Sequence, residues 1–353
     1  MKQSGFYKKL VTKLEAAGSK EWRRVILPVP FVQQHHHTCA PAALTSIAQY
    51  WKREVEHLEV ADEICYDGTP DYRERDWAEK AGWAVREFRV TVESAQCLID
   101  AGMPFVLNTV YPGGAHAQVV MGYDDHRAVL FIRDPGSRHT SEFLALESLE
   151  EQLPFGPRGF AMVPPEQAEK LASLPLPDTA AYDCLHRLHL ALSRHDRKSA
   201  QAALEDLRTA HADTTLRWRA EISMARYDGQ QSQHLAALEE ILKRHPKVED
   251  WRTSHLHLIN QVHGREAMLE RLRQLCAEKE SHPLHWQMLA RELHYDERHR
   301  PETRRLLRRI ERRRVDATLF ICEADMLWRK ERYEEATDLY RLAASLTSAM
   351  MTQ

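Results

Sequence analysis

The sequence predicts an α+β domain followed by an all-α solenoid of helical repeats. A helical apolar run comes early in the chain, from Cys39 to about Arg53, and short strand-like runs follow it between residues 85 and 163. Beyond residue 179 the strand patterns stop, and bulky aromatic residues recur about every 34 residues. A helix followed by an antiparallel meander is the order of an α+β fold rather than of alternating βαβ units.

Length and composition support two domains and an ordinary globular protein. The 353 residues exceed what one compact core usually serves. A formal net charge of −3 with 29% charged residues gives no general attraction to nucleic acid or to anionic membranes. No apolar run approaches the roughly 20 residues that cross a bilayer, and the first 18 residues lack the apolar core of a secretory signal. The six cysteines are dispersed, so we expect no disulfide scaffold and a cytoplasmic location.

The elements of the first part can be placed in order. Residues 1–24 form an N-terminal arm with a short amphipathic helix over 6–17, and the apolar run 25–30 contains two prolines, which predicts an edge strand. The remaining elements are helices over 56–82 and 94–101, and strands over 85–90, 104–107, 115–123, 128–132 and 160–163. We expect this domain to cover residues 25–168 and a linker to cover 169–178.

The second part, residues 179–353, reads as about five tetratricopeptide-like repeats. Trp218, Trp251, Trp286 and Phe320 are separated by 33, 35 and 34 residues. Tetratricopeptide repeats have a period of about 34 residues, with a large residue early in the first helix of each pair. The chain ends on the last unit without a polar capping helix, which leaves open whether further repeats or a partner follow.

Cys39 is the candidate nucleophile. It stands where a polar loop ends and a helix begins, and there the helix dipole and the free backbone N–H groups stabilise a thiolate. Its pattern separates it from the other five cysteines, for which burial in the core is the simpler interpretation.

A thiolate nucleophile needs a base, an orienting group and oxyanion donors. His116 opens a strand directly after a glycine turn and can serve as the base, and Asp134 ends the next strand and can hold the His116 ring. Gln33, six residues before Cys39, can point its amide at the oxyanion; Gln34 takes this role if the loop register differs by one.

These residues resemble the C39-like, papain-fold cysteine peptidases over about residues 25–165. The shared pattern is Gln-x5-Cys at a helix start, a His on a Gly-His-Ala-type strand followed by Gly-Tyr-Asp-Asp, and Asp-Pro one strand later; this chain has Ala40 where the family usually has glycine. The resemblance implies that Cys39 is the nucleophile, His116 the general base and acid, Asp134 the orienting residue and Gln33 the oxyanion donor. We expect Gly113, Gly114 and Ala40 to contact the substrate, with no metal and no cofactor.

The implied function is a cysteine peptidase that hydrolyses a peptide or isopeptide bond. The repeats would recruit a peptide or protein substrate or partner, and neither nucleic acid nor membrane is an expected partner. Two alternatives stay open: the same residues can deamidate glutamine or transfer an acyl group, and the chain can be a non-catalytic adaptor whose repeats carry the function.

Two conspicuous charged runs have simpler interpretations. Three adjacent histidines, His35 to His37, cannot all face one ion, so a solvated loop is favoured over a metal site. The run from Arg304 to Arg314 predicts a helix whose arginines form either a solvated face or a groove for an acidic peptide or protein. No aromatic pattern of nucleic-acid recognition accompanies it.

Overall fold

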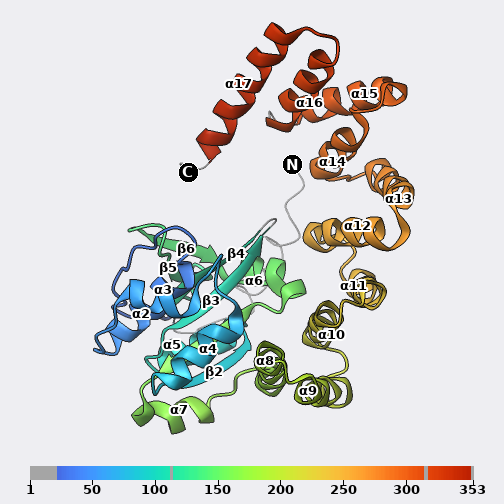
Figure 1. Cartoon of the computed structure of the whole chain (residues 1–353). Helices are drawn as coiled ribbons and strands as arrows, with labels where there is room; N and C mark the ends of the chain where they lie inside the picture. The colour runs from blue at the N-terminus through green and yellow to red at the C-terminus, as the bar shows by residue number, and fades with distance from the viewer. Residues whose placement is uncertain (1–21, 112–113, 314–316, 351–353) are drawn as a thin grey trace. The chain divides into compact units, whose positions relative to one another are not determined.

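The computed structural model describes residues 22–111, 114–313 and 317–350, and the predicted arm helix over 6–17 lies outside this range (Figure 1). The chain divides into two compact units, with the boundary inside α11 (Gln231–Arg244). The first unit holds a β-sheet with its helices, and the second holds helices alone. The predicted fold class, an α+β domain followed by an all-α repeat region, is confirmed.

Within the described residues, seven strands form one antiparallel sheet in the order β2-β7-β3-β4-β5-β6, with β1 beside β4. The strands are β1 (Arg24–Ile26), β2 (Ala84–Arg89), β3 (Phe105–Tyr111), β4 (Gly114–Asp124), β5 (Val129–Arg133), β6 (Thr140–Leu144) and β7 (Arg158–Val163). β4 is long because it pairs with β3 along its first half and with β1 along its last residues. This central strand begins at Gly114 and carries His116 as its third residue.

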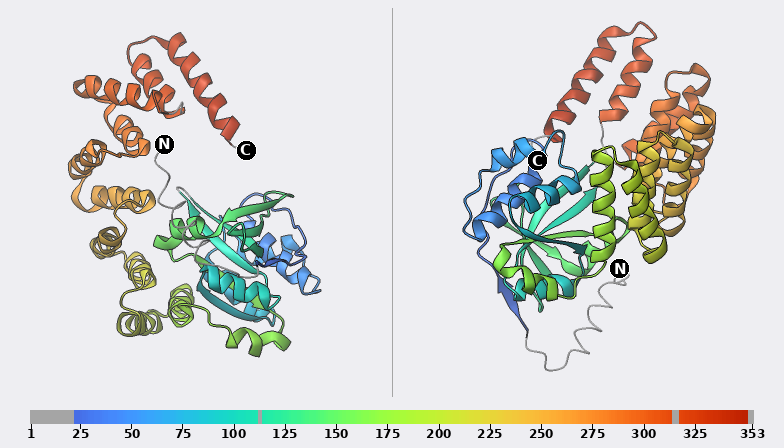
Figure 2. Two further views of the ribbon diagram at one scale, coloured as in Figure 1. Left: turned by 180° about the vertical axis from the view of Figure 1, so that it is seen from behind. Right: turned by 60° about the horizontal axis from the view of Figure 1, so that its bottom comes forward.

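Helices cover both faces of the sheet (Figure 2). One apolar cluster joins one face to α2 (Cys39–Tyr50), α3 (His57–Ile64) and α4 (Asp71–Lys80). A second cluster joins the other face to α5 (Val92–Asp100), α6 (Ala145–Gln152) and α7 (Ala168–Ser173). The alternation of β4 places Val119 and Met121 in the first cluster and Val120 in the second, so α2 is anchored to the face that carries Ala117.

Gly122 shows why β4 accepts β1 at such close range. A Cβ at this position would lie 2.4 Å from the carbonyl oxygen of Val25 and 3.2 Å from the ring of Phe131. The pairing of β4 with β5 also shifts register between Val120 and Gly122. Glycine is therefore required by the contact between neighbouring backbones, and the register shift marks a bulge at Met121 of β4.

The sequence analysis placed neither β6 nor α6. β6 pairs with β5 at the edge of the sheet, and its residues alternate between exposed and half-buried. Its sequence, TSEFL, contains two polar residues and a glutamate, so the apolar alternation that reveals a strand is weak.

Three helices after residue 178 belong to the first compact unit: α8 (Thr179–Ser193), α9 (Arg197–Ala210) and α10 (Thr215–Tyr227). The α8 residue Tyr182 is buried and donates its hydroxyl hydrogen bond to the carbonyl oxygen of Gly156. Arg75 of α4 pairs with Asp183 of α8 at 2.7 Å, and Arg219 of α10 pairs with Asp71 of α4 at 3.2 Å. The first helices of the repeat region are thus packed against the sheet domain.

The second unit consists of antiparallel helix pairs, which are α12 (Glu249–His263) with α13 (Arg265–Ala277), α14 (Pro283–Leu293) with α15 (Arg300–Glu311), and α16 (Ala317–Trp328) with α17 (Tyr333–Met350). The recurring aromatic residues Trp251, Trp286 and Phe320 fall on the first helix of each pair, and Trp286 is only 1% exposed. In the part of the chain that the structure describes, no helix is long and apolar enough to cross a membrane.

Candidate active site

Cys39 is the first residue of α2 and is partly exposed. The loop before it is fixed by Thr38, whose hydroxyl oxygen accepts a hydrogen bond of 2.8 Å from the His35 N–H and lies 2.9 Å from Nε2 of His57. The Ala-rich first turn of α2 is buried, so the helix start is anchored in the core. The sulfur therefore stands at the positive end of a fixed helix.

His116 is the third residue of β4, opposite Thr109 of β3. Its Nε2 lies 3.0 Å from Oδ1 of Asp134, the residue that directly follows β5. Asp134 Oδ1 also accepts a 2.7 Å hydrogen bond from the backbone N–H of Gly136, which holds the carboxylate in place. Because Nε2 is engaged by Asp134, the other ring nitrogen, Nδ1, remains for the thiol.

The electrostatics favour an ion pair between Cys39 and His116. Burial raises the pKa of the Cys39 thiol, but interactions with the His116 ring and with the backbone N–H of Ala117 outweigh it, so the pKa lies below its ordinary value. Burial lowers the pKa of His116, but the hydrogen bonds and charges of Asp134 and Cys39 outweigh it and raise the pKa to about 9. Burial raises the pKa of Asp134, but the His116 ring and the Gly136 N–H outweigh it and hold the pKa below its usual value. Both shifts therefore favour the thiolate–imidazolium pair over the neutral pair.

The two other cysteines with a clear shift behave in the opposite way. Burial raises the pKa of Cys276 and of Cys322 to about 12, although the charge of Arg309 acts against it at Cys276. Among these three thiols, only Cys39 has a lowered pKa.

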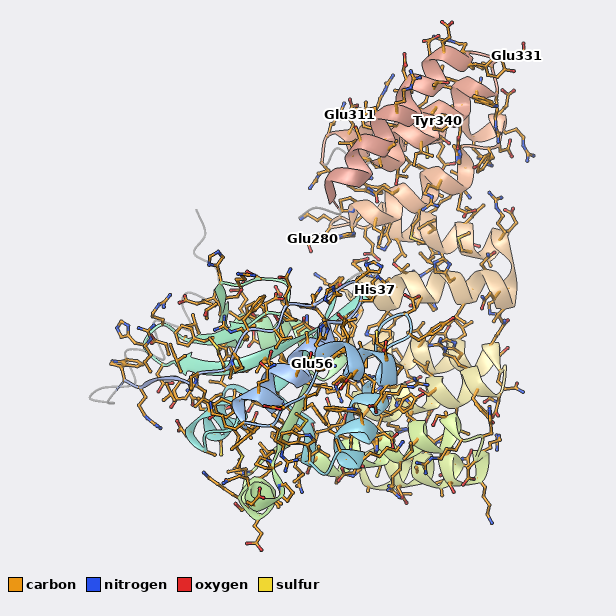
Figure 3. The ribbon with its side chains drawn as sticks, turned by 60° about the vertical axis from the view of Figure 1, so that its left-hand side comes forward. His37, Glu56, Glu280, Glu311, Glu331 and Tyr340 are labelled. Carbon is orange, nitrogen blue, oxygen red and sulfur yellow. The ribbon has the colours of Figure 1, made fainter. Side chains whose placement is uncertain are left out.

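A cavity of about 970 Å³ opens onto Cys39 and His116. Its lining comes from the loop before α2, from the loop and first turn of α4, and from the ends of β3 and β4. His37, labelled in Figure 3, belongs to this lining and pairs with Asp67 at 3.0 Å. The cavity is large enough for several residues of an extended peptide.

The structure puts Gln34, rather than Gln33, at the cavity. Gln34 is half-buried and lines the cavity, and its backbone N–H donates a 3.0 Å hydrogen bond to the carbonyl oxygen of Pro135, beside Asp134. Gln33 is exposed and is not part of the lining. The one-residue difference arises because the three histidines and Thr38 form a turn whose register the sequence does not reveal.

The structure describes two of the three residues that were expected to contact the substrate. Gly114 and the buried Ala40 both line the cavity, and a Cβ at Gly114 would lie 3.1 Å from the hydroxyl of Tyr111. Gly113 lies outside the described residues. Ala40 stands where the resemblance leads us to expect glycine, and it directly follows Cys39 within the regular first turn of α2.

The three histidines do not converge on one point, although the ring centroids of His36 and His37 lie 3.9 Å apart. The His35 ring stacks on His57 with centroids 5.4 Å apart, while His37 faces Asp67. Within the described part of the chain, no group of three or more His, Cys, Asp or Glu side chains is arranged to hold a metal ion.

Sequence reasoning missed a buried charged network under the cavity. Arg158 of β7 is 4% exposed and forms 2.6 Å ion pairs with Glu74 of α4 and Glu87 of β2. Glu74 lines the cavity, and burial raises its pKa to about 7 although the charge of Arg158 acts against it. The side-chain amide of Asn108 donates a hydrogen bond to the Asp71 carboxylate, and the Arg219 guanidinium donates another to it. Glu74 and Arg158 lie 84 positions apart in the chain, and no local pattern links them.

Comparisons with known proteins agree with the resemblance for the first part of the chain. Residues 26–148 match the family described as Peptidase C39 like. No curated protein matches the chain. Two solved structures are similar to parts of it. The peptidase domain of Streptococcus ComA, a bi-functional ABC transporter involved in a quorum sensing pathway, has a TM-score of 0.32 and 20% identity, and the match covers 38% of this chain and 96% of that one. A tetratricopeptide repeat protein from Parabacteroides merdae has a TM-score of 0.28 and 11% identity, and the match covers 47% of this chain and 93% of that one.

The matched segment contains the loop before α2, the whole of α2, and the strands that carry His116 and precede Asp134. The predicted resemblance is thereby confirmed: residues 26–148 match the model of the C39-like peptidase family, in a chain that continues as a helical repeat region.

Proposed function

We propose that this chain is a cysteine peptidase that cleaves an amide bond with Cys39, His116 and Asp134. The observation that carries the proposal is the cavity of about 970 Å³, where a helix-start thiol of lowered pKa meets an imidazole held by a carboxylate. A merely structural cysteine has no need of this arrangement, and buried structural thiols have raised pKa values.

The reaction starts from the Cys39 thiolate and the protonated His116 ring of the free enzyme. The Cys39 thiolate attacks the carbonyl carbon, a C–S bond forms, and the carbonyl π electrons move to oxygen. His116 then gives its proton to the leaving amine as the C–N bond breaks, which leaves an acyl-enzyme. A water molecule adds to the thioester while His116 takes the water's proton, and the C–S bond breaks to restore the thiolate.

Two donors are available for the oxyanion. One is the pair of backbone N–H groups of Cys39 and Ala40, which precede the first hydrogen bond of α2, donated by the Ala42 N–H to the carbonyl oxygen of Thr38. The side-chain amide of Gln34 is the second donor, since Gln34 lines the cavity and is tied to the loop that follows Asp134. One such donor is typically worth about 10²- to 10³-fold in kcat.

The helical repeats are proposed to recruit the peptide or protein that is cut. Repeat regions of this kind bind partners over extended surfaces. Because α8 and α10 contact α4, which contributes to the cavity lining, occupancy of the repeats has a physical route to the catalytic domain.

Labelling with a thiol-reactive peptide electrophile tests the proposal. We expect the wild type to be labelled once at neutral pH and Cys39→Ser to remain unlabelled. Cys65→Ser is the matched control, because Cys65 is also partly exposed, yet its thiol donates to the carbonyl oxygen of His37. Equal labelling of the wild type and Cys39→Ser would refute the assignment of the nucleophile.

Intact-mass analysis of candidate peptides then identifies the acceptor. A backbone cut supports the peptidase, a gain of about one mass unit indicates glutamine deamidation, and an adduct with an added amine indicates acyl transfer. If none of these products forms with any peptide tried while Cys39 is still labelled, the repeats carry the function and the thiol is a remnant.

A further inference from the structure

The helix α15 in the second unit carries an unusual concentration of arginine. Its buried residues, Thr303, Leu306, Leu307 and Ile310, lie on one side of the helix. On an α-helix, the residues at 300, 304, 305, 308 and 312 then lie on the opposite side. Together with Arg309 and Pro301 they line a surface hollow of about 690 Å³, and we name these six residues the arginine face: Arg300, Arg304, Arg305, Arg308, Arg309 and Arg312.

Most of these charges are not neutralised by the chain itself. Arg300 pairs with Glu297, and the guanidinium of Arg309 lies 3.9 Å from the ring centroid of Trp286. In the described residues, the other four members of the face (Arg304, Arg305, Arg308 and Arg312) form no ion pair within 4.0 Å, although the charge of Arg304 acts on Glu323 of α16, against the burial that raises the pKa of that carboxyl group. Arginines elsewhere in the same unit do, with Arg252–Glu278 at 2.9 Å, Arg265–Glu292 at 3.2 Å and Arg273–Glu302 at 3.1 Å.

The spacing of these arginines works against the helix. Arg300, Arg304, Arg308 and Arg312 follow one another at intervals of four residues, so each like charge lies directly above the last. Like-charge pairs at this spacing destabilise a helix. The negative C-terminal end of the helix dipole offsets the repulsion for Arg308 and Arg309, but it does not reach Arg304 or Arg305 in the middle of the helix. A bound anionic partner would relieve the repulsion that remains.

We propose that the arginine face binds an acidic segment of a protein, with Asp or Glu side chains that recur along about 12 Å, the length from Arg304 to Arg312. The planar guanidinium group matches a carboxylate with two parallel hydrogen bonds, which favours this occupant. Nucleic acid is disfavoured because the hollow is lined by arginines and one proline, with no aromatic side chain to stack on a base. Glu311 at the end of the same helix, labelled in Figure 3, also limits how far a polyanion can extend.

The experiment measures binding of a fluorescent twelve-residue peptide with glutamate at every third or fourth position, by anisotropy, to the whole chain. The test variant is Arg304→Glu/Arg308→Glu. The control is Arg298→Glu/Arg332→Glu, which makes the same change in net charge at exposed arginines that already pair with Asp296 and Glu335. We expect the test variant to weaken binding about tenfold or more, and the control to change it less than about twofold.

Thermal unfolding by circular dichroism shows whether each variant is folded. The test variant should unfold close to the wild type, because it turns two of the three like-charge contacts at this spacing into opposite-charge contacts, which offsets the new contact between two acids and the lost attraction of Arg304 to Glu323. Equal weakening by both variants would show a net-charge effect and overturn the proposal, as would unchanged binding by the test variant or no binding by the wild type. A single-stranded oligonucleotide of equal charge is the second probe; tighter binding than the peptide at matched salt would assign the face to nucleic acid instead.

Discussion

Nε2 of His116 lies 3.0 Å from Oδ1 of Asp134, and the same carboxylate oxygen accepts the Gly136 N–H at 2.7 Å. The carboxylate is thus fixed by its own loop before it meets the imidazole. Its negative charge, together with that of the Cys39 thiolate, keeps the His116 ring protonated up to a pKa of about 9, even though burial opposes the charge. The ring is therefore oriented by Asp134 after β5 and kept charged by Asp134 together with Cys39 at the start of α2.

Asp134→Ala should move the alkaline limb of the pH–rate profile. His116 must hold a proton to release the amine, so kcat/KM falls as the pH rises through the pKa of His116, about 9 in the wild type. Without Asp134, burial dominates, that pKa drops, and the limb shifts to lower pH. We also expect about 10²-fold lower kcat/KM at neutral pH from loss of orientation. Asp134→Asn keeps an acceptor and should shift the limb with a smaller loss; an unmoved limb in both variants would show that Asp134 does not act on His116.

Gln34→Ala should lower kcat about 10²- to 10³-fold with little change in KM, because the amide is proposed to contact the oxyanion that exists only in the transition state. Gln33→Ala is the matched control at an exposed neighbouring position and should retain activity within about twofold. A large loss of kcat in Gln33→Ala, with little change in Gln34→Ala, would instead assign the oxyanion donor to Gln33.

Arg158→Met should destabilise the first unit by about 3–5 kcal/mol, since it leaves Glu74 buried without its cation and leaves Glu87 with Arg75 alone. The free energy of unfolding from urea titration measures this change. Adding Glu74→Gln and Glu87→Gln to Arg158→Met should recover much of the loss, because no uncompensated buried charge remains. If Arg158→Met alone is as stable as the wild type, the network is not buried as the structure shows.

A chain ending at residue 178 should be less stable than one ending at residue 230. The shorter chain loses Tyr182, which is 2% exposed, and the ion pairs of Arg75 and Arg219 to α8 and α4. Loss of a buried aromatic residue alone typically costs about 3 kcal/mol or more. Urea unfolding of the two chains, followed by tryptophan fluorescence, measures the difference. Equal stability would show that α8 to α10 do not support the sheet domain.

Local patterns were enough to predict much of the first unit. A polar loop running into an apolar helix located Cys39 at the start of α2, and a glycine turn before an apolar strand located His116 near the start of β4. These signals lie within a few residues of the sites they mark, so a single sequence contains them. The edge strand β6 carried no such signal, because its solvent face is polar and its apolar face is short.

Contacts between distant segments could not be predicted in the same way. The choice between Gln33 and Gln34 depends on how the loop before α2 meets Pro135, about 100 residues later in the chain. The partnership of Arg158 with Glu74 and Glu87 depends on the placement of α4 against β7 and β2, which only the folded sheet determines.

The pH dependence of Cys39 alkylation tests the central claim most directly. The rate constant for modification of Cys39 by iodoacetamide is followed by peptide mass spectrometry in the wild type and in His116→Ala, with the buried Cys276 as an internal reference. We predict a midpoint below the ordinary thiol pKa of about 8.5 in the wild type and a rise of the midpoint in His116→Ala. A wild-type midpoint at or above the ordinary value, unchanged by removal of His116, would contradict an activated thiolate at this site.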